Sequence, residues 1–199
     1  FQCEFGNWPV SAERIQNEVV SVVLGEPAIR GSFAKAALWS SNSKALEFYG
    51  RALRASQINR DLAAAEAFLR ESVAADAVFV DARSALAELL MNQGQWEAAL
   101  EQAASALKLD PNDARSLRVR GARSWVIGKA LDAELDLRST LRVFPDDPSA
   151  LRFLGHLCQA TGRLSEAAKL LGDCVAADPM ADENFSIQAQ LGCILARRG

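Results

Sequence analysis

The residues that could carry covalent chemistry are few, and they are not spaced for it. His156 is the single histidine, so a Ser-His-Asp or Cys-His site would have to be built around it. The sequence contains no GxSxG elbow, no GxGxxG or Walker loop and no CxxC pair. We therefore expect no catalytic activity, no metal site and no cofactor. The cysteines are predicted to be free thiols, mostly packed in the core: Cys3, Cys158, Cys174 and Cys193.

The chemistry that the sequence does offer is the recognition of negative charge by arginine. Residues 61–113 hold ten Asp/Glu and three Lys/Arg, whereas residues 114–155 hold eight Lys/Arg and five Asp/Glu. A guanidinium group binds a carboxylate through two parallel hydrogen bonds. Whether these arginines gather on one surface depends on the elements that carry them.

Composition limits the class of protein. The chain has 199 residues, is 50% hydrophobic and carries a net charge of −3, which indicates one or two domains with a real core. This charge offers no general attraction for nucleic acid or an anionic membrane. No apolar stretch approaches the roughly 20 residues of a membrane span. The chain starts at Phe1 without a signal-peptide pattern, so we expect a piece of a longer protein, whose compartment (cytoplasm or periplasm) is left open.

A period of 34 residues organises the chain, with repeats that start at Leu46, Val80, Ala114 and Pro148. Glycine at position 15 permits the left-handed conformation that ends a first helix. Proline at position 32 cannot continue a second helix. Small residues at positions 8, 20 and 27 let the two helices approach closely. These positions hold Ala87, Gly121 and Gly155 (8), Gly94, Gly128 and Gly162 (15), Ala65, Ala99, Ala133 and Ala167 (20), Ser72, Ala106, Thr140 and Cys174 (27), and Pro111, Pro145 and Pro179 (32).

From residue 46 to 199 this pattern resembles the tetratricopeptide repeat (TPR) family. The resemblance implies an all-α fold, a right-handed superhelix (α-solenoid) of about four helix-turn-helix repeats plus a terminal helix, with a concave groove. The first repeat departs from the pattern, with Arg60 and Ala77 at positions 15 and 32. After Pro179 the register returns only if residues are inserted near 181–183, which predicts a partial fifth repeat near residue 185.

Residues 1–45 do not follow the repeat, and we expect a separate segment with a short strand at its start and a helix from Ser11. The residues "SSNS" at 40–43 are predicted to cap the first repeat helix. The stretches "IQNEVVSVVLG", "ALEFYGRAL" and "AAAEAFLRESVAAD" are similar to a part of bacterial CadC-like or cyclase-linked multidomain regulators, in which a TPR array is C-terminal. This second resemblance implies the sensory or interaction part of a bacterial regulator.

The TPR resemblance also predicts a binding wall. In that family, positions 2, 5, 9 and 12 of each first helix face the concave groove. In this chain those positions place arginines on two adjacent helices, so the expected ligand is an acidic peptide segment or a chain terminus. The predicted peptide-binding residues are Met91, Glu88, Arg115, Arg118, Trp125, Arg152 and His156.

The same charged residues also have interpretations that involve no ligand. The groove arginines could instead pair with acidic neighbours such as Glu88 and Asp81. The acidic run at Asp132, Glu134 and Asp136 is predicted to be the solvated face of a second helix. Two further arginines, at 120 and 123, stand at positions 7 and 10, where the family packs apolar groups. They either lie along the packed helices or mark a lateral surface for dimer contact.

The function that the sequence favours is a non-enzymatic module that binds a peptide or partner protein in its groove. It would make no contact with nucleic acid and would not insert into a membrane. One alternative is a structural dimerisation or assembly domain, and another is a TPR chaperone for a secreted protein.

Overall fold

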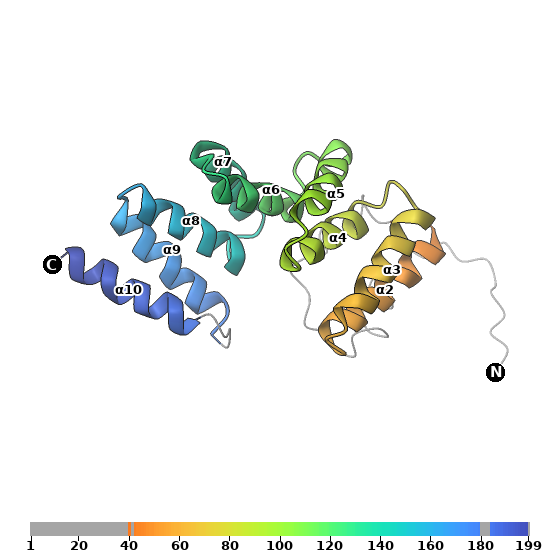
Figure 1. The fold of residues 1–199 in the computed structure, drawn as a ribbon, viewed down its shortest axis with the longest axis horizontal. Helices are drawn as coiled ribbons and strands as arrows, with labels where there is room; N and C mark the ends of the chain where they lie inside the picture. The colour runs from red at the N-terminus through yellow and green to blue at the C-terminus, as the bar shows by residue number, and fades with distance from the viewer. Residues whose placement is uncertain (1–39, 41, 180–183, 199) are drawn as a thin grey trace. The chain divides into compact units, whose positions relative to one another are not determined.

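The computed structural model describes residues 40, 42–179 and 184–198, and every regular element in them is an α-helix (Figure 1). This confirms the all-α prediction. The strand and helix expected within residues 1–39 lie outside the described residues, as does the expected insertion at 181–183. The helices are α2 (Ser43–Gln57), α3 (Leu62–Ala75), α4 (Val80–Asn92), α5 (Trp96–Leu109), α6 (Ala114–Val126), α7 (Ala130–Val143), α8 (Pro148–Ala160), α9 (Leu164–Ala177) and α10 (Asn184–Arg198).

The helix boundaries follow the 34-residue period. The first helices α4, α6 and α8 begin at the predicted repeat starts Val80, Ala114 and Pro148. The second helices α3, α5, α7 and α9 also begin 34 residues apart. Helix α2 begins earlier than the expected Leu46, because the Asn42 side chain accepts hydrogen bonds from the backbone N–H groups of Lys44 and Ala45. The cap expected from "SSNS" is therefore confirmed at Asn42.

The turns between paired helices use the left-handed conformation predicted at position 15. Gly94, Gly128 and Gly162 have φ angles of 77°, 80° and 77°. The backbone N–H groups of Gly94 and Gln95 bond back to carbonyls in the last turn of α4. Arg60 takes the same place in the first repeat with a φ of 53°, a strained conformation for a residue with a Cβ.

Close approach of the paired helices accounts for the small residues. The alanines at position 20 have no exposed surface. A Cβ placed on Gly155 would lie 2.8 Å from the Leu171 side chain, so only glycine fits between α8 and α9 there. In the first and third repeats the side chain at position 27 also donates a hydrogen bond to the start of the paired first helix. Thr140 Oγ1 bonds the Ala114 carbonyl at 3.1 Å, and Ser72 Oγ bonds the Ala45 carbonyl at 2.7 Å.

The chain divides into two compact units, and the first ends at Ala82. In this unit α2 packs antiparallel against α3 through buried alanines and Leu69. The Tyr49 and Phe79 rings meet edge to face with their centroids 5.2 Å apart. These contacts close a small core of one helix pair.

The second unit, Arg83–Gly199, holds the rest of the repeats. Leu137, Leu154 and Leu171 are almost completely buried and join α7, α8 and α9 in one core. Helix α10 packs beside α9 and adds Ile187 and Ile194 to that core. In the part of the chain that the structure describes, no helix has the length and apolar character needed to cross a membrane.

Candidate functional site

The predicted binding residues occupy repeat-equivalent places on the first helices of the second unit. Helix α4 carries Glu88 and Met91, α6 carries Arg115, Arg118 and Trp125, and α8 carries Arg152 and His156. We call these seven residues the first-helix face. The 34-residue period fixes their register, because each first helix starts at the same repeat position.

Arg118 lies at the centre of this face and is nearly inaccessible, with 7% of its surface exposed. Its guanidinium donates to two carboxylates, Glu88 on α4 and Asp147 before α8. The other oxygen of Asp147 accepts the Ala150 backbone N–H at 2.8 Å and caps α8. A single side chain thus connects three consecutive repeats. Asp147 was not predicted, although its place before Pro148 is a recognisable N-cap position.

Glu88 also binds the second arginine of α6. Arg115 Nε lies 3.0 Å from Glu88 Oε2, and both side chains keep about a third of their surface exposed, 28% and 32%. The alternative interpretation, that the arginines pair with acidic neighbours, therefore describes what Arg115 and Arg118 do with Glu88. The two pairs differ in exposure, and only Arg115 remains open to solvent on one side.

The remaining residues of the face divide into exposed and packed groups. Arg152 is half-buried and stacks over the Phe153 ring, with 4.9 Å from its guanidinium carbon to the ring centroid. Trp125 and His156 are also half-buried. Met91 is 9% exposed, so most of its side chain is already covered by the protein. The accessible part of the face is thus polar and aromatic.

A second group of charges connects the second helices α7 and α9. Arg163 donates to both oxygens of Glu134 at 2.7 and 2.8 Å, and Arg138 donates to Glu166 at 2.6 Å. Chiefly because of the Arg163 hydrogen bonds, the pKa of Glu134 falls to about 2. The hydrogen bond from Arg138 lowers the pKa of Glu166 in the same way. We call Glu134, Arg138, Arg163 and Glu166 the α7–α9 ion-pair cluster.

The expectation of a solvated acidic face on α7 is wrong for Asp136. This carboxylate is 5% exposed and accepts two hydrogen bonds of 2.7 Å from Arg120. Helix α7 turns Asp136 toward α6 rather than toward solvent. The hydrogen bonds that Arg120 donates to Asp136 raise the pKa of Arg120.

The described residues contain no group of three or more His, Cys, Asp or Glu side chains that could hold a metal ion. Cys158 is fully buried, and burial raises the pKa of its thiol to about 11. Such a thiol is protonated at neutral pH and is a poor nucleophile. Cys174 is also buried, as expected, whereas Cys193 is exposed, and Cys3 lies outside the described residues.

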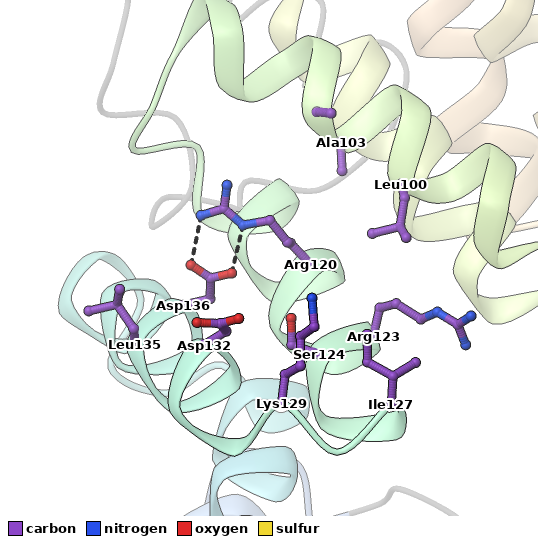
Figure 2. A pocket seen from close by; sticks show the side chains of 11 residues that line it. Leu100, Ala103, Arg120, Arg123, Ser124, Ile127, Lys129, Asp132, Leu135 and Asp136 are labelled. Carbon is purple, nitrogen blue, oxygen red and sulfur yellow. Dashed lines mark hydrogen bonds and ion pairs between the residues drawn. The ribbon is translucent and has the colours of Figure 1, made fainter.

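A groove of about 510 Å³ lies away from the first-helix face, between α5, α6 and α7 (Figure 2). None of the predicted binding residues lines it. Its walls include Arg120 and Arg123, which the sequence had marked as departures from the repeat pattern.

Comparison with known proteins agrees with the repeat geometry. Two family models described as tetratricopeptide repeat match residues 56–122 and 125–180, which together make up more than half of the chain. No curated protein sequence matches.

Solved structures show the same fold. MamA from Desulfovibrio magneticus RS-1 is 21% identical over 80% of this chain and 88% of its own, with a TM-score of 0.59. TTC0263, a thermophilic TPR protein from Thermus thermophilus, is 20% identical over 76% of this chain and 81% of its own, with a TM-score of 0.56. YrrB, described as a TPR protein with an unusual peptide-binding site, is 17% identical over 89% and 88%, with a TM-score of 0.52.

Proposed function

The chain belongs to the tetratricopeptide repeat family, whose members are generally protein–protein interaction modules, and we propose that it binds a peptide or partner protein on the first-helix face. Support comes from one observation above all. Two neighbouring first helices carry half-buried arginines, Arg115 and Arg152, at positions on the same side of the repeat, with Trp125 between them in the sequence. Arginine and tryptophan are the side chains most often found at energetic centres of interfaces.

The ligand class follows from the weak contacts within the protein that Arg115 and Arg152 could give up for contacts with a ligand. The Arg115–Glu88 pair is partly solvated and contributes about 0–1 kcal/mol. Stacking of the half-buried Arg152 on Phe153 contributes a similar amount, about 1 kcal/mol. A carboxylate of a ligand can therefore replace or share these contacts at small cost. The favoured ligand is an acidic segment or a C-terminal carboxylate.

Arg118 has a different role in the proposal. It is buried between Glu88 and Asp147, so a ligand would have to displace a desolvated carboxylate to reach it. We assign it to holding the three repeats in place, so that Arg115 and Arg152 keep their spacing. The setting that the N-terminal resemblance suggests, a bacterial regulator with a preceding sensor or effector domain, is part of the same proposal.

The test uses peptides selected from a random library displayed with a free C-terminus, and measures affinity by fluorescence anisotropy. The paired substitution Arg115→Glu and Arg152→Glu should weaken binding of acidic peptides at least about tenfold, because two favourable charge contacts become repulsive. The matched control is Lys108→Glu with Lys169→Glu, the same charge change at exposed positions on the second helices α5 and α9.

The control should bind within about twofold of the original chain, a difference below 0.5 kcal/mol. Circular dichroism must show the same helix content in all three proteins. If the arginine substitutions and the control lysine substitutions weakened binding equally, only the net charge of the protein would matter. If the arginine substitutions left binding unchanged, Arg115 and Arg152 would not belong to the site.

A further inference from the structure

The groove between α5, α6 and α7 has an unusual distribution of polarity when it is compared with the next repeat. Its floor holds the Arg120–Asp136 ion pair (Figure 2). The residues 34 positions later are Leu154 and Leu170. A charged pair thus stands where the following repeat packs two leucines. This difference removes apolar packing from the floor and leaves the groove open.

At the rim of the groove the difference is the opposite one: uncharged residues stand where the next repeat has charged residues. On α5 the groove is lined by Leu100 and Ala104, and their counterparts 34 residues later are Glu134 and Arg138. Those counterparts are the α7 half of the α7–α9 ion-pair cluster, which joins α7 to α9 directly. Helix α5 has no charge at these two places, so no such bridge joins α5 to α7.

The α7 side of the groove has the charged residues that an ion-pair bridge to α5 would use. Lys129 and Asp132 correspond to Arg163 and Glu166, the α9 half of the cluster. Among the described residues Lys129 forms no ion pair, whereas Arg163 is held by Glu134 at 2.7 Å. Beside them on α7, Leu131 and Leu135 are 83% and 65% exposed. One end of α7 therefore presents a cation, an anion and two leucines to solvent.

We propose that this surface, formed by Leu100, Lys129, Leu131, Asp132 and Leu135, binds a second copy of this chain across a two-fold axis. It is an interaction surface in addition to the first-helix face and does not depend on the proposed peptide binding. The occupant is argued from charge complementarity. Lys129 and Asp132 have opposite charges and lie three residues apart. The proposed two-fold axis passes between them, so that each Lys129 meets the other copy's Asp132.

The apolar residues fit the same arrangement. Leu131 and Leu135 lie four residues apart on one side of α7, which is the spacing for a helix that lays a stripe into a groove. Leu100 and Ala104 offer an uncharged opposite wall. The Arg120–Asp136 pair stays intact in this dimer, since both groups already satisfy one another at the floor. A partner with one sign of charge would match only half of this surface, whereas a second copy supplies both signs and the same leucines.

The experiment is sedimentation equilibrium of the whole chain from about 1 μM to about 1 mM, a range that detects weak dimers. We expect reversible dimerisation. Lys129→Asp and Asp132→Lys should each weaken it at least about tenfold, because each creates two like-charge contacts in a symmetric dimer. The decisive step is to mix these two single variants: a heterodimer should form with close to the original affinity, since every contact is again between opposite charges.

Three further measurements complete the test. Leu131→Ser with Leu135→Ser should abolish the dimer, and Lys108→Asp, on an exposed part of α5 outside the groove, should leave it unchanged. Circular dichroism confirms folding of each variant. A chain that stays monomeric throughout the concentration range overturns the proposal. So does a dimer that the Lys129 and Asp132 variants do not weaken, or one that the mixture does not restore.

Discussion

Arg118 and Arg152 occupy the same position of consecutive repeats, yet their surroundings give them different roles. Arg118 is enclosed by Glu88 and Asp147, whereas Arg152 lies over a phenylalanine ring at a half-buried place. Truncation of a buried ion-pair partner leaves the remaining charges unpaired and partly desolvated. Truncation of Arg152, which is half-buried, leaves no fully desolvated charge behind.

Arg118→Ala is therefore expected to lower the free energy of unfolding by about 2–4 kcal/mol. Arg152→Ala should lower it by about 1 kcal/mol or less. Urea denaturation of the two variants beside the original chain measures both values. Equal losses would show that Arg118 does not hold the repeats together as described.

Glycine positions offer a second comparison between matched residues. A Cβ on Gly155 would meet the buried Leu171 side chain at 2.8 Å, while a Cβ on Gly172 would have no neighbour within 4 Å. Both glycines lie inside helices, so alanine improves helix propensity at each by up to about 1 kcal/mol. Only at Gly155 is that gain opposed by overpacking.

Gly155→Ala is expected to destabilise the protein by about 1–2 kcal/mol, whereas Gly172→Ala should stabilise it by about 0.5–1 kcal/mol. Thermal denaturation followed by circular dichroism shows directly whether each substitution raises or lowers the melting temperature. Stabilisation by both substitutions would mean that α8 and α9 can separate without cost, against the close packing seen here.

At the scale of helices, the period predicted most of the architecture. Starts at Val80, Ala114 and Pro148, left-handed glycines and buried small residues all follow from backbone requirements that recur every 34 residues. Pairing of the groove arginines with Glu88 was one of the two interpretations that the sequence left open. The other charge partners did not follow, because side-chain pairing between helices depends on which residues the fold brings together. Arg118 with Asp147 is one such pair, and the α7–α9 ion-pair cluster is a set of them.

One missed feature left a trace in the sequence. Arg120 departs from the apolar pattern at position 7, and Asp136 departs from it in the second helix of the same repeat. Comparison with Leu154 and Leu170 in the next repeat would have suggested that the two changes compensate one another. The prediction of a solvated acidic face considered α7 alone, and it therefore placed Asp136 on the wrong side.

The α7–α9 ion-pair cluster makes stability depend on pH. Glu134 has a pKa of about 2 in the folded protein against an ordinary value of 4.5, so between these values the unfolded state binds more protons. The stabilisation is complete above about pH 4.5 and is lost as the pH falls toward 2. Solvent screening reduces it to about 1–2 kcal/mol, because the arginines are partly exposed.

Glu134→Gln should therefore reduce the free energy of unfolding at pH 7 and flatten its decline between pH 4.5 and pH 2.5. Urea denaturation at several pH values measures this slope. Glu101→Gln, an exposed position on α5, should retain the steep decline. If the Glu134 variant declined as steeply as the original chain, the cluster would not be the source of the acid sensitivity.

In the whole molecule, the two proposed binding surfaces lie on two different sets of helices. First helices carry Arg115, Trp125 and Arg152 for a ligand, and the surface that includes Lys129 and Leu135 on α7 serves a second copy. Because no residue belongs to both proposed surfaces, we expect that the chain can bind a partner while it is itself a dimer. Peptide binding should then be unchanged by Lys129→Asp, a substitution that acts on the dimer alone.

An NMR titration of the isotope-labelled chain with the tightest acidic peptide tests binding on the first-helix face directly. Chemical shifts should change along the first-helix face, at Arg115, Trp125, Arg152 and His156, and those of Leu100 and Leu135 on the second helices should stay unaffected. Shifts that concentrate on the second helices, with α6 and α8 unchanged at their exposed residues, would contradict binding on the first-helix face.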